Sequence, residues 1–468
     1  MTRAPMIAAT LGALLLAGCS LAPRTVLPVP PVPPTWPAGS AQLAANEAAL
    51  PVVSYRDIFT DPRLQTLIAS ALDNNRDIRV AAANLAAARA QVRVTRANQF
   101  PEIGVGGNVT RVEQGGGKAG DNTSYSAQGG VSGFELDLFG KLANATQAQR
   151  DAALSTEAGA RTVRLGVIAD LALAWATYAY DRELLDIARS TADNAQRSVT
   201  LTTARLKGGV APRTDVRQAE QILETARGAV AAQQAALAQD INAVRLLVGD
   251  GFDETLLPTS LADVTAHLAV LPAGTSSQVL LRRPDVIGAE YDLRAANADI
   301  GVARAQLFPS ISLTGLLGFA SNALSSLFTS GAFAATGAAD ASWSLFNAGG
   351  KTANVDVAKA QRDAALATYE KTIQTAFREV ADALAVQATL GERLRAAVAN
   401  TAAAQDTARL TEARYREGVD SYLSSLDAQR SLYTARNTEL ALRLQVARNR
   451  ITLYSVLGGD QAAATPQS

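Results

Sequence analysis

The sequence predicts an internally duplicated α+β membrane protein, in which long helices carry four strands and several chains complete one barrel. Three observations predict this class. One order of elements occurs twice along the chain. The longest predicted helices contain no proline, and the predicted strands have the length and the alternating polarity of membrane-spanning β-strands.

The composition suits long helices in close contact and excludes several kinds of function. Lys plus Arg is 43 and Asp plus Glu is 43, so the formal net charge of zero argues against electrostatic binding of nucleic acid. The chain has one Cys and one His, whereas a zinc site of the Cys/His type needs about four such ligands. We therefore predict no enzyme, no cofactor and no metal site.

The first 18 residues read as a secretory signal peptide. Arg3 precedes an apolar run that is too short to span a bilayer as a helix. The run ends in Leu16-Ala17-Gly18-Cys19, which is the pattern of a bacterial lipoprotein signal. Cys19 is therefore the predicted lipid attachment site, and Ser20 after it favours the outer membrane. An ordinary signal peptide with a chance Cys is the alternative, weakened because Cys19 is the only Cys.

A proline-rich segment follows, and we interpret residues 19–61 as a lipidated tether. The stretch "LAPRTVLPVPPVPPTWPAGS" holds an extended backbone that is not expected to build a core.

The remaining chain is predicted to consist of two repeats, residues 62–258 and 281–458, joined by residues 259–280 and followed by a tail, 459–468. The letters "AQRDAAL" at 148–154 recur at 360–366. Three shorter matches occur in the same order: Phe100-Pro101 with Phe308-Pro309, Gly209-Val210 with Gly418-Val419, and Val248-Gly249 with Leu457-Gly458.

Each repeat is predicted to contain a helix, two strands, a very long helix, a tight turn and a return helix. Phe100-Pro101 and Phe308-Pro309 mark the transitions from helix to strand, and Gly208, Gly209 and Gly418 mark the turns. The first repeat has its helices at 62–99, 141–207 and 213–248 and its strands at 102–113 and 124–138. The second has helices at 285–306, 351–417 and 420–457 and strands at 310–321 and 333–346.

The spacing of apolar residues supports these predictions. A 3-4 spacing through the last helix, from Leu423 to Tyr454, indicates contact with neighbouring helices of the coiled-coil kind. On the strand 310–321 the period is two, so that Ile311 and Leu313 lie on one face and Ser312 and Thr314 on the other.

The dimensions predict how many chains are needed. A strand of ~12 residues tilted by ~45° rises ~28 Å, which is the height of a bilayer's hydrocarbon layer. Four strands cannot close a barrel, since membrane barrels begin at about eight. Three chains would supply twelve strands and would pool helices of ~100 Å into a tube. The alternative is a soluble α+β protein with two hairpins packed on helices.

Several stretches resemble the TolC-like outer membrane efflux family, in its lipoprotein branch. They are "LRRPDV" at 281–286, "AANADIGVARAQLFPSISLTGLLG" at 295–318, "RYREGVDSYLSSLDAQRSLY" at 414–433 and "FELDLFGK" at 134–141. The resemblance implies a homotrimer with a twelve-stranded β-barrel in outer membrane lipid, continuous with a long periplasmic α-helical barrel. It also implies a passive duct for small molecules such as drugs, docked to a periplasmic adaptor and an inner-membrane pump of the RND class.

The turns at Gly208, Gly209 and Gly418 should form the periplasmic tip, where a duct must be closable. Leu423, Asp427 and Arg430 share one face of the last helix, so three-fold symmetry would bring three Asp427 carboxylates toward the axis. The alternative is that Asp427 and Arg430 form a surface pair.

The resemblance adds roles to residues near these turns. It places Leu423 and Asp427 at the constriction, and Thr214, Asp215 and Tyr415 where bonds hold the tip shut. Ser424 stands where some members have a second Asp, so a double carboxylate ring is not expected.

Other functions stay open at this point. A coiled-coil periplasmic adaptor would show one helical hairpin between small β-domains rather than a duplication. A channel for type I protein secretion would share every feature above. "GGGK" at 115–118 lacks the upstream Gly of a phosphate loop, and His267 has no partner at a metal-binding spacing that the sequence reveals.

Overall fold

The computed structural model describes residues 20–33, 36, 54–112, 122–269 and 277–459. Cys19, the predicted signal peptide, the "GGGK" stretch and nearly all of the predicted tail lie outside the described residues. The chain divides into two compact units. The first unit comprises Met1–Val29, Asn84–Glu157 and Gly288–Glu370. The second unit comprises Pro30–Ala83, Ala158–Ile287 and Lys371–Ser468. No helix among the described residues is both long enough and apolar enough to span a membrane.

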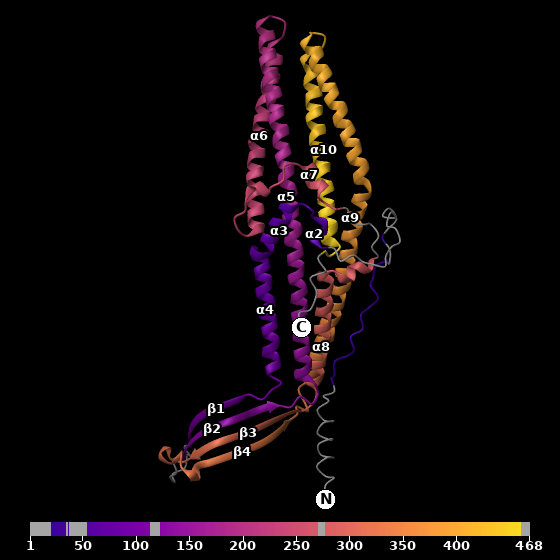
Figure 1. The fold of residues 1–468 in the computed structure, drawn as a ribbon. Coiled ribbons are helices and arrows are strands. Elements are labelled where there is room, and N and C mark those ends of the chain that lie inside the picture. Colours follow the sequence, from indigo (N-terminus) through magenta and orange to yellow (C-terminus); the bar gives the residue numbers. More distant parts are fainter. Residues whose placement is uncertain (1–19, 34–35, 37–53, 113–121, 270–276, 460–468) are drawn as a thin grey trace. The chain divides into compact units, whose positions relative to one another are not determined.

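The order of elements recurs in the two halves of the chain (Figure 1). The first half contains α4 (Arg76–Ala97), β1 (Ile103–Val112), β2 (Asn122–Glu135), α5 (Lys141–Lys207) and α6 (Arg213–Val248). The second contains α8 (Pro284–Ala305), β3 (Ser310–Ser321), β4 (Phe333–Ser342), α9 (Gly350–Arg416) and α10 (Tyr422–Val456). Both α5 and α9 have 67 residues, as expected from stretches without proline.

The predicted helix 62–99 is wrong in one respect, because it is broken at Asn75 into α3 (Pro62–Asn74) and α4. The buried Asn75 side chain donates to the Leu247 carbonyl oxygen at 2.8 Å. Its own oxygen accepts from the backbone N–H groups of Asp77 and Ile78, and thereby caps α4.

The strands also end earlier than predicted. β2 ends at Glu135 instead of 138, and β4 ends at Ser342 instead of 346. Ser342 pairs with Ser310, the first residue of β3, so the chain beyond Ser342 has no strand to pair with. The last return helix begins at Tyr422, two residues later than predicted, after Ser421 has capped it.

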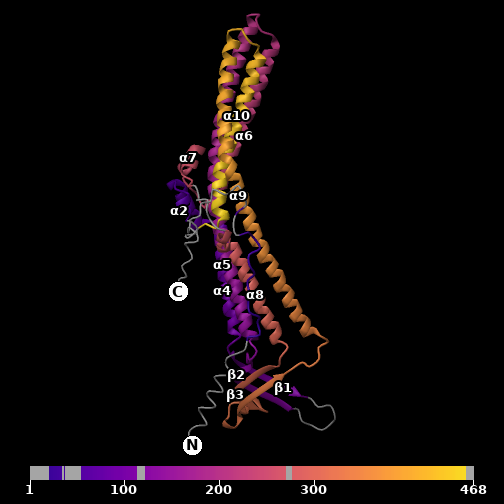
Figure 2. The same ribbon diagram turned by 90° about the vertical axis from the view of Figure 1, so that its right-hand side faces the viewer.

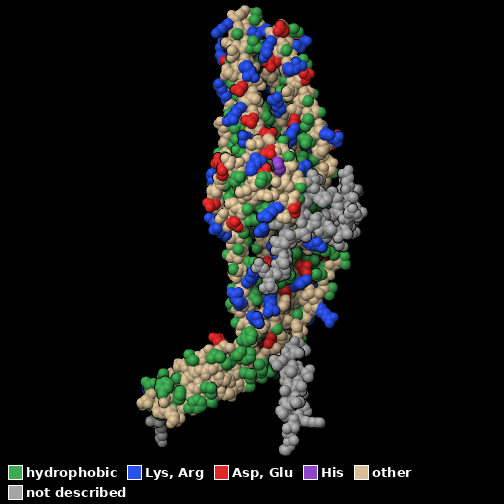
Figure 3. Space-filling model, viewed as in Figure 1, with side chains coloured by type: hydrophobic (Ala, Val, Ile, Leu, Met, Phe, Trp, Pro, Cys, Tyr) green, Lys and Arg blue, Asp and Glu red, His purple; other side chains and the backbone are tan. Residues whose placement is uncertain are grey.

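The first unit contains one antiparallel sheet in the order β1-β2-β3-β4. The central pairing, β2 with β3, joins the two halves of the duplication, for example at Tyr125 and Ser321. A bulge interrupts it between Val131 and Phe134. β1 and β4 are the edge strands, each with one side unpaired among the described strands. Figure 3 shows many hydrophobic side chains on the visible face of the sheet.

In the same unit the segment that follows Cys19 is extended, as predicted, but it is bound to helices. Ser20 Oγ donates to Asn144 Oδ1 of α5 at 2.8 Å. Asn297 and Arg304 of α8 donate to the carbonyl oxygens of Pro23 and Leu21, at 2.6 and 3.0 Å. These hydrogen bonds therefore hold the start of the tether, residues 20–23, against α5 and α8.

The main core belongs to the second unit and is centred on α5. Trp175 and Leu171 of α5 are buried with Ile168, and the Trp175 indole donates to the Leu256 carbonyl oxygen at 3.0 Å. Residues from both ends of the chain join this core, because the rings of Phe59 and Tyr454 pack edge to face.

Part of the predicted tether therefore contributes to the core, contrary to expectation. Residues 55–58 form a short helix, α2 (Tyr55–Ile58), whose first and last side chains are buried. Trp36 is also buried and stacks on Phe377 at 4.9 Å between ring centroids. The joining segment 259–280 contributes α7 (Leu261–Ala266), which buries Leu261 and Val264. Prolines fix the backbone of the earlier residues but do not prevent these aromatic and aliphatic side chains from packing.

Candidate functional site at the tip of the two hairpins

The candidate site is the tip where the α5–α6 and α9–α10 hairpins end, within the second unit (Figure 2). Both turns are built in the same way. Gly209 and Gly418 have φ of 72° and 76°, a left-handed conformation that favours glycine. In each turn the N–H of the following valine donates to the carbonyl oxygen five residues before it, from Val210 to Arg205 and from Val419 to Arg414. The predicted turn residues therefore do end the long helices.

Arg205 links the two hairpins at this tip. It lies in the last turn of α5, and its guanidinium donates to the carbonyl oxygens of Tyr415 and Arg416 at the end of α9, at 2.8 and 3.3 Å. The same guanidinium stacks over the Tyr415 ring, 4.8 Å from its centroid. A cation beside the last carbonyl groups of a helix also meets the negative end of the helix dipole. Arg205 therefore stabilises the end of a helix in the other hairpin.

Arg414 stands at the position in the second turn that corresponds to Arg205, yet it has a local role. Its guanidinium forms two hydrogen bonds with the Asp420 carboxylate of its own turn, at 2.7 and 3.0 Å. The first turn has Ala211 at the place of Asp420, so Arg205 has no carboxylate there to fold back on. The duplication is thus asymmetric, and the difference frees Arg205 to reach the second hairpin.

Aromatic rings fill the space beneath this link. Tyr415, Tyr422, Leu426 and Ala219 form a small buried cluster, with the two tyrosine rings 5.4 Å apart. Val199, Leu201 and Ile222 pack against the cluster. All four helices of the two hairpins contribute, so burial of this cluster holds the hairpins together at the tip.

Burial also changes the acid–base behaviour of the tip. It raises the pKa of Tyr422 to about 12, although a hydrogen bond with Ser198 opposes the rise. The pKa of Tyr415 is raised by burial as well, with the Arg205 charge acting in the opposite direction. Burial raises the pKa of Asp215, and the nearby Arg205 again opposes the change. The tyrosines therefore stay neutral in the physiological range.

The three residues expected to hold the tip shut are only partly brought together. Tyr415 is buried and Asp215 is half-buried, whereas Thr214 is exposed. In the described part of the tip no hydrogen bond joins any two of the three, and the buried Tyr415 hydroxyl has no partner there. The hydrogen bonds that link the two hairpins of the chain at this tip come instead from Arg205 to the backbone of Tyr415 and Arg416.

The residues expected to line the constriction lie on the surface of the single chain. Leu423 is 57% exposed, and Asp427 and Arg430 are also exposed. Over the described residues Asp427 and Arg430 form no ion pair, so the simple surface-pair alternative is not what the structure shows. Their side chains are free to face other copies of the chain.

A groove of about 450 Å³ lies beside the tip, between the α5–α6 hairpin and α10. Its lining is mostly apolar. The lining residues include Ala188, Asn194, Ile222, Ala226, Leu426, Arg430 and Tyr433.

The four predicted transition residues lie in the first unit, between helix and strand as expected. α4 ends at Ala97 before Phe100-Pro101, and α8 ends at Ala305 before Phe308-Pro309. In both places the phenylalanine N–H donates to the carbonyl oxygen three residues earlier, which closes the last helical turn. Phe308 stacks on Phe139 with ring centroids 4.6 Å apart, so this corner packs against the start of α5.

Sequence reasoning missed Arg205 and Tyr422. Aligning the two turns gives a usable signal for Arg205, since only one of the two corresponding arginines has an Asp in its own turn. Tyr422 offers no comparable signal, because an aromatic residue at the start of a helix has many possible environments.

Known proteins of one family match this chain along nearly its whole length. The family model for outer membrane efflux proteins matches residues 67–250 and again 275–459. The chain is 40% identical over 463 residues to the probable efflux pump outer membrane protein TtgC of Pseudomonas putida, covering 97% of this chain and 96% of that protein. It is 38% identical over 457 residues to the cation efflux system protein CusC of Escherichia coli O157:H7, covering 96% and 97%.

Solved structures share the fold. A crystal structure of CusC superposes with a TM-score of 0.84 at 37% identity, covering 94% of this chain and all of that one. The open state of the MtrE outer membrane channel of Neisseria gonorrhoeae gives a TM-score of 0.83 at 32% identity, covering 95% and 99%. The predicted fold class is therefore confirmed.

Proposed function

Because the chain belongs to the outer membrane efflux protein family, we propose that it is the exit duct of a three-component efflux system, and that three copies form the duct. It is an outer membrane efflux channel and not an enzyme. It conducts its cargo passively, and the energy comes from its partners.

The four-stranded sheet is the single observation that carries the proposal of a shared barrel. Both edge strands have unpaired backbone groups along one side, and such groups cost several kcal/mol each in hydrocarbon. Twelve strands from three chains would pair every edge. The exposed apolar side chains of Val105, Val109, Leu313 and Leu317 supply surface for lipid contact.

The partners follow from the same family membership. A periplasmic adaptor would contact the helical hairpins, and an inner-membrane pump of the RND class would supply the energy. Relatives are named as toluene, solvent, antibiotic and cation efflux proteins, so small molecules or ions are the expected class of cargo. Lipid attached at Cys19 would add an anchor in the outer membrane, next to the fixed residue Ser20.

The tip is the proposed gate. In a three-fold assembly the exposed Leu423 and Asp427 of each α10 would face the axis and form an apolar ring and a carboxylate ring. Arg205 would hold the α5–α6 hairpin to the end of α9 and oppose outward movement of the hairpins. Contact with the adaptor would then shift the population toward the open tip.

Two measurements on the purified lipidated protein test the proposal. A heat-sensitive trimer on gel electrophoresis and single channels in a planar bilayer are the expected results. A monomer without channel activity would overturn the proposal.

Substitution tests the gate separately. Asp427→Ala should raise single-channel conductance, because it removes three carboxylates from the narrowest ring. The matched control is Glu412→Ala, which removes a carboxylate from the outside of α9 near the same tip. Equal conductance of the wild-type protein and Asp427→Ala would remove Asp427 from the gate.

A further inference from the structure

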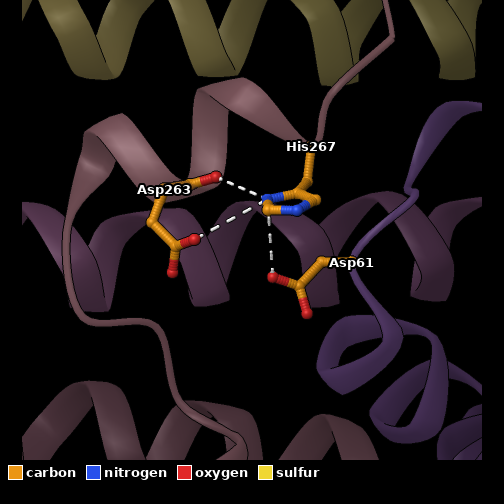
Figure 4. Close-up of side chains that lie close together, drawn as sticks. All are labelled: Asp61, Asp263 and His267. Carbon is orange, nitrogen blue, oxygen red and sulfur yellow. Dashed lines mark hydrogen bonds and ion pairs between the residues drawn. The ribbon is translucent and has the colours of Figure 1, made fainter.

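A compact group of possible metal ligands lies in the second unit, far along the chain from the tip turns. It comprises Asp61, Asp263 and His267, whose ligand atoms all lie within 4.8 Å of one another (Figure 4). Asp61 caps α3 from the last residue of the predicted tether, whereas Asp263 and His267 belong to the joining segment. The group therefore forms where the start of the first repeat meets the link between the repeats.

The two residues of the joining segment have a spacing that suits chelation. Asp263 lies in α7 and His267 caps its end, four residues later, so both side chains point to one side of the helix. The same i, i+4 spacing lets two side chains on one helix hold a metal ion in known proteins. His267 Nδ1 lies 3.6 Å from Asp263 Oδ1 and 3.9 Å from Asp61 Oδ2. These separations are slightly larger than those between two ligand atoms about 2 Å from one ion.

Charged side chains surround the three residues. Asp61 is almost fully buried, at 2% side-chain exposure, and the Arg63 guanidinium beside it holds its carboxyl ionised. Arg63 binds both carboxylates, at 2.6 Å to Asp61 and 2.5 Å to Asp263. A second guanidinium lies nearby, because Arg450 of α10 donates to the carbonyl oxygens of Thr265 and Leu268, at 2.9 and 3.0 Å. A bound cation would therefore have to compete with Arg63 for the two carboxylates.

Not all ligand atoms are used by Arg63. Both oxygens of Asp61 accept from Arg63, Oδ1 from its backbone and its Nε, and Oδ2 from its Nη2. Asp263 Oδ2 faces Arg63, whereas Asp263 Oδ1 faces the imidazole. His267 Nδ1 lies 3.0 Å from the Asp263 carbonyl oxygen, to which its proton would be donated. A metal ion that replaced this proton would meet the Asp263 carbonyl oxygen as well, beside the carboxylate oxygens of Asp61 and Asp263.

We propose that Asp61, Asp263 and His267 bind a divalent transition metal ion of the kind that prefers imidazole together with carboxylate, such as Zn²⁺. Mg²⁺ and Ca²⁺ prefer oxygen ligands alone and should bind far more weakly. From the sequence we predict no metal site, and the signal missed there is the i, i+4 spacing of Asp263 and His267. At 42% exposure His267 leaves room for entry and for water as a fourth ligand.

Binding would tighten a contact that the backbone already makes. Thr60 N–H donates to the His267 carbonyl oxygen, and Ala269 N–H donates to the Ile58 carbonyl oxygen, both at 2.9 Å. The metal ion would add a bond between these same two segments. It should therefore stabilise the folded chain, by an amount that rises with the logarithm of the ratio of its concentration to its dissociation constant.

The single histidine makes the direct test specific. Protein labelled with ¹⁵N at histidine and purified without a histidine tag shows the imidazole nitrogens of His267 alone. Zn²⁺ should shift the Nδ1 signal at constant pH, whereas Mg²⁺ should not. His267→Gln and Asp263→Asn should each weaken Zn²⁺ binding in calorimetry by about tenfold or more, with Asp73→Asn on the exposed side of α3 as the control. A His267 signal that responds to pH but not to Zn²⁺ would overturn the proposal.

Arg63 provides a second test, because it competes with the metal ion for the same two carboxylates. Arg63→Gln removes the competing charge and leaves Asp61 buried without its partner. The variant should be less stable than the wild-type protein without metal, and Zn²⁺ should raise its unfolding temperature by more than it raises that of the wild-type protein. Arg63→Gln combined with His267→Gln should lose the Zn²⁺ effect. Equal effects of Zn²⁺ on all three proteins would show nonspecific binding and would also overturn the proposal.

Discussion

Two carboxyl groups face each other between α5 and α6, and they make the best-defined titrating pair outside the tip. Asp181 of α5 and Asp240 of α6 lie close enough for their carboxyl groups to interact, and a hydrogen bond between them requires a proton on one of the two. Burial, reinforced by Asp181, raises the pKa of Asp240 to about 7. Burial also raises the pKa of Asp181, and Arg448 of α10 opposes that rise. Asp240 Oδ2 is buried and has no other donor among the described residues.

This pair predicts how stability depends on pH. The pKa of Asp240 in the folded chain is above its value of 3.8 in an unfolded chain, so the folded state loses stability as pH rises from about 4 to about 7. Asp240→Asn keeps a hydrogen-bond donor and does not ionise. Its unfolding temperature, followed by circular dichroism in detergent, should exceed that of the wild-type protein by more at pH 8 than at pH 5. A difference that does not change with pH would mean that the two groups share no proton.

At the scale of the elements, the two hairpin turns show what duplication preserves and what it changes. The backbone bonds around Gly209 and Gly418 are the same, whereas the corresponding arginines have different partners. Arg205 reaches the other hairpin, and Arg414 stays within its own turn. The two hairpins are therefore alike in backbone structure but differ in how they are held.

The difference gives a matched pair of substitutions. Arg205→Ala removes the hydrogen bonds to the Tyr415 and Arg416 carbonyl oxygens and should raise the frequency of channel opening in a planar bilayer. Arg414→Ala removes an ion pair within a single turn and leaves the contact between the hairpins in place, so it should change channel opening much less. If the two variants behave alike, Arg205 has no special part in closing the tip.

Elements that depend on local signals were predictable from the sequence. The bounds of α5 and α6 follow from a stretch without proline and from Gly208-Gly209 between them. The break at Asn75 was not predictable, because it depends on the carbonyl oxygen of Leu247, which is distant in the sequence. The same holds at the candidate site. Gly209 and Gly418 could be found by conformational preference, but the role of Arg205 depends on a backbone carbonyl group of another helix.

At the scale of the whole molecule, the sheet determines how copies must associate. Within one chain β1 pairs with β2, β2 with β3 and β3 with β4. Among the described strands, β1 and β4 therefore each keep one unpaired edge. The simplest closed arrangement pairs β1 of one copy with β4 of the next, which repeats around a three-fold axis.

Disulfide crosslinking tests this arrangement. In a protein that keeps Cys19, one cysteine is placed along β1 at Val105 or Val109 and one along β4 at Ala335 or Ala339. At least one combination should give covalent dimers and trimers on oxidation, since strands that pair lie about 5 Å apart. Controls with a single added cysteine should give no covalent trimer. If every combination yields monomers only, β1 and β4 of neighbouring copies are not paired.

The pairing of Tyr125 with Ser321 also has a consequence for biosynthesis. β3 emerges from the ribosome only after all of α5 and α6 has been made, so the middle of the sheet cannot form while the first half of the chain is being synthesised. Local helical hairpins form quickly, whereas contacts between distant segments form slowly. The β1–β2 hairpin must therefore be kept from aggregating during export, and insertion into lipid should be the last step of maturation.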